Sequence, residues 1–96
     1  MLVYISGKIS GLDYKHALNN FNNAEKKLNE QGYNVINPMK VIPFDPDKEW
    51  IDYMELALDL MVDCDSIFSM PNWESSDGAR IEKKFSKVLH LTEVKL

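Results

Sequence analysis

Hydrophobic residues follow two different spacings along this chain, and the two spacings alternate. Short apolar runs occur at residues 2–5, 33–36 and 66–70, and residues 94–96 end a fourth, shorter run. The first run is apolar at consecutive positions, which is typical of a strand covered on both faces. Between the runs, apolar residues recur every three or four positions, and this spacing predicts amphipathic helices.

Capping residues set the expected ends of three helices. Asp13 can cap the first helix, and Gly32 is its natural left-handed stop. A second helix is expected from an N-cap at Asp47 to about Asp63, and a third over residues 77–89. The second helix carries its apolar face on Trp50, Ile51, Met54, Ala57, Leu58 and Met61.

Strands that alternate with helices through short connections predict an α/β fold with a short parallel sheet of about four strands. Residues 1–96 are expected to form one domain, since a chain of this length can bury one modest core. Ligands of such sheets bind beyond the carboxyl ends of the strands. The expected loops at that end are residues 6–12, 37–46 and 71–78, and they hold most of the chain's distinctive polar residues.

Composition narrows the possible partners. The formal net charge is −4 and the lysines are scattered, which argues against a duplex nucleic-acid surface but allows a single nucleotide. The one cysteine, Cys64, predicts a small buried hydrophobe and a reducing compartment. No apolar run is long enough to span a membrane, and no charged leader precedes the first strand. We therefore expect a cytoplasmic protein.

The loop after the first strand is a candidate binding site. It reads Gly7, Lys8, Ile9, Ser10, Gly11. Its two glycines would let backbone amides approach an anion or a hydroxyl group beside a helix N-terminus. A plain tight turn explains the same residues equally well.

A second polar loop follows the third strand. Ser76 or Asp77 can cap the next helix there. Trp73 either covers the core or offers a platform for a flat ligand.

Glu82 is the most distinctive residue of the third helix. Ile81, Phe85, Val88 and Leu89 define the apolar arc of that helix, and Lys83, Lys84 and Lys87 define its wet face. Glu82 falls at the edge of the arc in the second turn, which predicts a half-buried carboxylate aimed at the strand ends. The alternative is a solvated glutamate paired with a neighbouring lysine.

The sequence has no residue spacing typical of a metal site and no nucleophile elbow. We therefore expect no metal and no cofactor.

These segments together resemble the nucleoside 2-deoxyribosyltransferase superfamily, and most closely a compact, largely uncharacterised branch from bacteria and phages. The resemblance rests on three segments in matching order and spacing, and it covers nearly the whole chain. They are Tyr4-Ile5-Ser6-Gly7-Lys8-Ile9-Ser10-Gly11, then Cys64-Asp65, then Trp73-Glu74-x-Ser76-x-Gly78-Ala79-x-x-Glu82.

The resemblance implies a flavodoxin-like or Rossmann-like three-layer α/β/α fold and cleavage of an N-glycosidic bond through a covalent intermediate. Glu82 matches the family's nucleophile, and Tyr4 matches the tyrosine that positions it. The groups that bind the substrate in this family match the loop 7–11 and Ser76. Trp73 and Gly78 belong to the same motif as Ser76 and are also expected to bind substrate. A nucleoside or nucleotide is therefore the expected partner.

Two positions depart from the family pattern. The family commonly has an acid on the second helix that protonates the leaving base, and Ala57 stands there with its side chain expected inward. Asp59 points the opposite way by the same count. Ser10 replaces an arginine of the phosphate-binding branch, so a phosphate would depend on Lys8, backbone amides and Ser76.

Three readings follow from these observations. The first is a deoxyribosyltransferase or N-glycosidase acting on deoxynucleosides or their monophosphates, which Tyr4 and Glu82 favour. The second is a catalytically weak nucleoside-binding module, which Ala57 favours, and the third is an interaction protein that keeps only the fold. A homodimer or larger homo-oligomer is also expected, because Trp50, Tyr53 and Met54 make the second helix more apolar than one sheet face requires.

Overall fold

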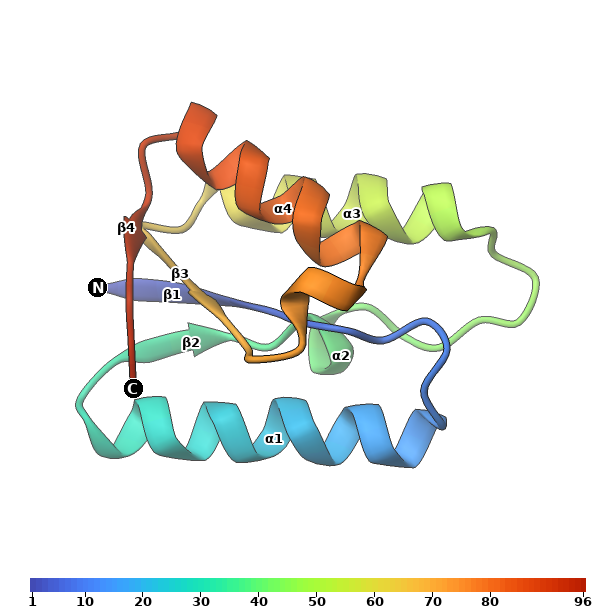
Figure 1. Cartoon of the computed structure of the whole chain (residues 1–96), viewed down its shortest axis with the longest axis horizontal. Coiled ribbons are helices and arrows are strands. Elements are labelled where there is room, and N and C mark those ends of the chain that lie inside the picture. Colours follow the sequence, from blue (N-terminus) through green and yellow to red (C-terminus); the bar gives the residue numbers. More distant parts are fainter.

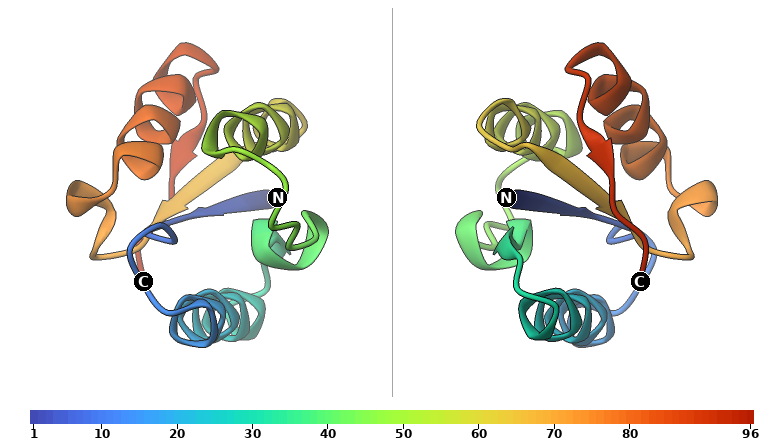
Figure 2. Two further views of the ribbon diagram at one scale, coloured as in Figure 1. Left: turned by 90° about the vertical axis from the view of Figure 1, so that its right-hand side faces the viewer. Right: turned by 90° about the vertical axis from the view of Figure 1, so that its left-hand side faces the viewer.

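A parallel sheet lies between two layers of helices in the computed structural model, which describes residues 1–96 (Figure 1). The strands are β1 (Leu2–Ser6), β2 (Asn34–Ile36), β3 (Ser66–Ser69) and β4 (Thr92–Glu93), and they pair in the order β2-β1-β3-β4. Helix α1 (Tyr14–Glu30) covers one face, and helices α3 (Trp50–Val62) and α4 (Asp77–Val88) cover the other (Figure 2). The predicted α/β class with four parallel strands is therefore confirmed.

Side chains of β1 alternate between the two layers, as strand geometry requires. Val3 and Ile5 pack with Phe21 and Leu28 of α1 in one core cluster. Tyr4 packs in a second cluster with apolar residues that include Ala57 and Met61 of α3. Because β1 is central and buried on both faces, its residues reach both cores and its carboxyl end opens between the helical layers.

The caps expected for the first helix are present. The Asp13 side chain accepts a hydrogen bond from the backbone N–H of His16. Gly32 adopts φ +91°, the left-handed conformation that glycine tolerates best after a helix. No helix of the chain is long and apolar enough to cross a membrane.

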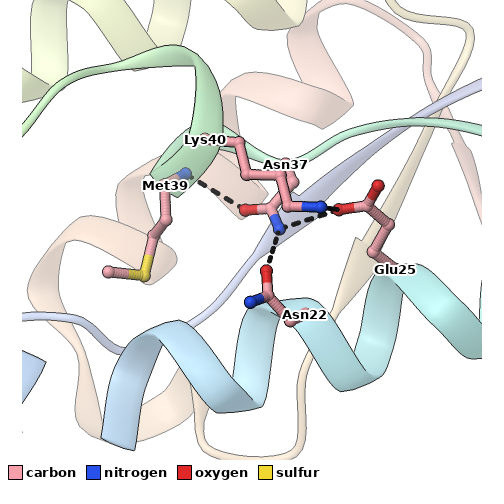
Figure 3. A network of polar contacts seen from close by, with 5 residues as sticks. All are labelled: Asn22, Glu25, Asn37, Met39 and Lys40. Atoms are coloured by element: carbon pink, nitrogen blue, oxygen red, sulfur yellow. Dashed lines mark hydrogen bonds and ion pairs between the residues drawn. The ribbon is translucent and has the colours of Figure 1, made fainter. Parts of the chain in front are cut away.

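A short helix, α2 (Pro38–Val41), occupies part of the segment 37–46 that was expected to be a loop. The buried Asn37 begins it, since its Oδ1 accepts from the Met39 backbone N–H. The Asn37 Nδ2 donates to Asn22 and Glu25 of α1, and Lys40 pairs with Glu25 (Figure 3). These contacts fix α2 against α1.

The expected cap at Asp47 is wrong. Glu49 precedes α3, and the Glu49 backbone N–H donates to the Asp52 side chain in a capping box. The Asp47 backbone N–H instead donates to the Asp45 carboxylate, which tightens the loop before the helix.

The last strand lies earlier than residues 94–96. β4 comprises Thr92–Glu93, and Lys83 of α4 pairs with Glu93. Val94 still donates a backbone hydrogen bond to Ile67 and is buried, which explains its apolar character.

Candidate active site

A pocket of about 610 Å³ opens beyond the carboxyl ends of the strands. Its walls come from the loop after β1, the segment from α2 to α3, the inner face of α3 and the first turns of α4. Most of the lining is apolar, which suits a flat organic ligand. The polar side chains among the lining residues belong to Tyr4, Ser10, Tyr14, Asp45, Lys48, Trp50, Tyr53, Ser76 and Glu82.

Glu82 lies in the interior of this pocket and is only 6% exposed. Its Oε2 accepts a hydrogen bond from the Tyr4 hydroxyl at 2.6 Å, and its Oε1 accepts one from the Ser6 hydroxyl at 2.7 Å. Both donors come from β1, Tyr4 from its middle and Ser6 from its end, and the carboxylate comes from the second turn of α4. The two hydrogen bonds hold both carboxylate oxygens in a defined position.

The surroundings of Glu82 oppose its ionisation. Burial raises the pKa of the Glu82 carboxyl from 4.5 to about 7, although the hydrogen bonds from Ser6 and Tyr4 act in the opposite direction. Burial, and then the nearby charge of Glu82, raise the pKa of the Tyr4 hydroxyl well above its ordinary value. Tyr4 therefore stays protonated and acts as a donor, while Glu82 changes its charge near neutral pH.

The expectation that Glu82 is half-buried at the edge of an apolar arc is wrong. Ile81 and Val88, which were placed in that arc, are 41% and 71% exposed. The inward residues of α4 are Ala79, Glu82 and Ser86. Phe85 and Leu89 do pack against the core, as expected. Small and hydrogen-bonded polar residues share the inner face of α4 with them, so the apolar pattern was right only in part.

Most residues predicted for substrate binding line the pocket. Gly7, Ile9, Ser10 and Gly11 do so, and Gly11 has φ +86°. A side chain on Gly7 would overlap Met70, so glycine at this position has a packing role in addition to any binding role.

Ser76 and Gly78 lie at the beginning of α4 and also line the pocket. The Ser76 hydroxyl accepts the Ala79 backbone N–H at 3.1 Å and caps the helix. Lys8 lies in a smaller hollow that adjoins the pocket and shares Ser10, Ser76 and Gly78 with it. The structure therefore gathers seven predicted binding residues around Glu82 and the adjoining hollow.

Trp73 does not belong to this group, which corrects its assignment to the same site. It forms part of a 3-10 turn, Trp73–Ser75, and lines a different pocket beside α1 and the chain's C-terminal segment. The Lys83 ammonium lies 4.3 Å from the centre of its ring. The indole thus packs against a lysine that was expected on the wet face of α4.

Several polar residues of the site were not predicted from the sequence, among them Ser6, Asp45 and Tyr53. Ser6 could have been found, because strand alternation places it on the same face as Tyr4. Asp45 and Tyr53 gave no local signal. The Tyr53 hydroxyl accepts the Asp45 backbone N–H and donates to the Asp45 carbonyl, both at 2.7 Å, so α3 holds the loop that carries Asp45.

The side chain of Ala57 faces inward, as expected. Ala57 is buried and lines the pocket, whereas Asp59 is exposed on the other side of α3. Cys64 is also buried, and burial raises the pKa of its thiol to about 11. No three His, Cys, Asp or Glu side chains lie together in a way that could hold a metal ion.

Comparison with known proteins agrees with this architecture. The family model described as "Domain of unknown function (DUF4406)" matches residues 1–95. Among solved structures, the chain is similar to a "2-desoxiribosyltransferase from Leishmania mexicana", with a TM-score of 0.68 and 17% sequence identity. The alignment covers 97% of this chain and 61% of the Leishmania chain. No curated protein sequence matches.

Proposed function

The chain belongs to the DUF4406 family, whose description assigns no function, and we propose that it cleaves the N-glycosidic bond of 2-deoxynucleosides or their monophosphates. In this proposal residues 1–96 form one nucleoside 2-deoxyribosyltransferase-like domain of the cytoplasm. The fold it shares with an enzyme named as a 2-desoxiribosyltransferase supports the assignment. The observation that carries it is the buried Glu82 carboxylate, whose two oxygens are oriented by Tyr4 and Ser6 inside the pocket.

The proposed reaction is a double displacement. A Glu82 oxygen attacks C1′ of the sugar, the bond to the base breaks, and a glycosyl ester forms on Glu82. Water or a second base then attacks C1′ and releases the carboxylate. Tyr4 and Ser6 position Glu82 by hydrogen bonding, which keeps the attacking oxygen aimed at C1′.

The remaining predicted residues are assigned to substrate binding. The backbone of the loop 7–11 and the Ser76 hydroxyl would contact the 5′ end of the sugar. A 5′-phosphate would enter the adjoining hollow, where Lys8 supplies the positive charge and the α4 N-terminus supplies its dipole.

A second candidate function is nucleoside binding without turnover. Ala57 favours it, because the inner face of α3 presents a methyl group where an acid would protonate the leaving base. General acid catalysis typically contributes about 10²- to 10⁴-fold, so its loss could leave a slow enzyme or a binding protein.

Two assays on the wild-type chain test these functions. A nucleoside at about 100 times its Kd should stabilise the fold by about 2.7 kcal/mol, which raises Tm by roughly 10–20 °C for a domain of this size. We expect such a shift with at least one common deoxynucleoside or monophosphate, and free base should then appear in chromatography. Binding without base release would favour the binding module, and no shift with any of them would contradict both functions.

We also propose that the chain assembles through α3 into a homodimer or larger homo-oligomer. Met54, which was expected at this interface, is buried within the protomer. The outer face of α3 nevertheless exposes Ile51 and Val62, at 50% and 59%. Light scattering at high micromolar concentration should give at least twice the mass of one chain, and Ile51→Glu with Val62→Glu should return it to one. A wild-type mass of one chain would contradict the assembly.

A further inference from the structure

The pocket is lined by a second acidic residue, Asp45, to which the proposed reaction has so far given no role. Asp45 and Glu82 are the two carboxylates that line it. Glu82 lies in the interior, whereas Asp45 belongs to the partly exposed loop between α2 and α3. Cleavage of a glycosidic bond by paired carboxylates uses one as a nucleophile and the other as a proton donor.

Asp45 is held in place by contacts that leave its carboxylate available. The Tyr53 hydroxyl bonds both the backbone N–H and the carbonyl of Asp45, at 2.7 Å each. Tyr53 lies one helical turn before Ala57, on the same side of α3. The Asp45 carboxylate accepts only the Asp47 backbone N–H, at 3.0 Å on Oδ1, and no ion pair engages it.

The surroundings of Asp45 suit a flat base. Phe44, the preceding residue, packs against Tyr14 with ring centroids 5.3 Å apart, and both rings line the pocket. These rings are 65% and 43% exposed, so they mark the outer part of the pocket. A base that extends outward from a sugar at Glu82 would lie beside these rings and reach Asp45.

We propose, on the basis of the function proposed above, that Asp45 is the general acid of base release and that the substrates are purine 2-deoxynucleosides. A purine accepts its proton at N7, which points away from C1′, whereas a pyrimidine accepts it at O2, which lies close to C1′. An acid in the outer loop, away from the interior Glu82, therefore fits a purine.

The proposed reaction has two steps. Glu82 bonds to C1′, the electron pair of the C1′–N9 bond passes to the purine, and N7 takes the proton of the Asp45 carboxyl. The purine leaves neutral, with Asp45 ionised and Glu82 esterified. Water then bonds to C1′, its proton returns to Asp45, and the Glu82 carboxylate is released with the free sugar.

A leaving-group comparison tests this assignment. The substrates are 2′-deoxyguanosine and N7-methyl-2′-deoxyguanosine, whose base already carries the positive charge and leaves without a proton. Asp45→Asn should slow guanine release from the first by about 10²- to 10⁴-fold and change release from the second by only a few fold, after the uncatalysed rate is subtracted. Asp47→Asn, an exposed neighbour outside the pocket, is the matched control and should behave as wild type.

The outcomes separate this proposal from the one on which it rests. Equal slowing of both substrates by Asp45→Asn would assign Asp45 to positioning and overturn the acid role, as would no slowing of either. Wild-type release of pyrimidines but of no purine would overturn it while leaving the Glu82 function intact. Wild-type release of no base would overturn both. A Tm within a few degrees of wild type establishes that Asp45→Asn folds. The hydrogen bonds from Tyr53 go to the backbone of Asp45, so the substitution leaves them in place.

Discussion

Glu82→Gln should abolish base release and leave nucleoside binding within a few fold. Glutamine keeps the shape of the side chain and can still bond to the hydroxyls of Tyr4 and Ser6, but it cannot form the glycosyl ester. We expect single-turnover release to fall by about 10³-fold or more, as happens when a covalent nucleophile is removed. Chromatography of the free base gives the rate, and titration with the unreacted nucleoside gives the binding constant.

Two further variants make this test specific. Glu74→Gln changes an exposed glutamate in the 3-10 turn before α4 and should release base at the wild-type rate. Tyr4→Phe removes one of the two hydrogen bonds to Glu82. It should slow release by about tenfold to a hundredfold, since a hydrogen bond to a charged group is worth about 1.5–3 kcal/mol. Base release from Glu82→Gln at the wild-type rate would show that the nucleophile is another group.

The fold could be predicted because its determinants are local or periodic. Four apolar runs and the intervening helical spacing are enough to indicate a parallel α/β sheet. Asp13 and Gly32 mark the ends of α1 through their own backbone chemistry, and both lie where they were expected. The short α2 was missed because Asn37 begins it through contacts with α1 that no local pattern reveals.

The site was less predictable because its contacts join distant segments. Tyr4 and Glu82 are separated by 78 positions, and only a family resemblance connected them before their hydrogen bond was seen. The sequence prediction underestimated the burial of Glu82. Hydrophobic periodicity treats every glutamate as a surface residue and does not take account of the hydrogen-bond donors that allow a carboxylate to be buried. Asp45 depends on a loop that Tyr53 holds in place, so only the folded chain reveals it.

Trp73 illustrates the opposite error. An indole in a loop at the strand ends has two favourable environments, a ligand pocket or a cation and apolar surface elsewhere. The 3-10 turn and Lys83 place it in the second environment. Residue type and motif position do not distinguish these two environments. The course of the 3-10 turn, which the sequence does not reveal, determines where the indole points.

The stability of the wild type should fall as pH rises from 5 to 8, and Glu82→Gln should lack that component. The pKa of Glu82 is about 7 in the fold, against 4.5 when it is unperturbed. The folded state therefore holds this proton more tightly than the unfolded chain does. The stabilisation is fully present below about pH 4.5 and is lost as pH rises through 7, amounting to about 3 kcal/mol.

Urea unfolding of both proteins between pH 4 and pH 8 measures this term. Other titrating groups act in both proteins and largely cancel, so the difference in the free energy of unfolding should shift by about 3 kcal/mol in favour of Glu82→Gln. A difference that is constant with pH would mean that Glu82 ionises normally in the fold.

The same titration connects stability with chemistry. The attack on C1′ requires the ionised carboxylate, which is the form that burial of Glu82 disfavours. The hydrogen bonds from Tyr4 and Ser6 lower the pKa of Glu82 against that burial, and so they keep a usable fraction ionised near pH 7. Tyr4→Phe should therefore raise the pKa of Glu82 and extend the loss of stability to higher pH, as well as slow base release. One hydrogen bond would then account for both effects.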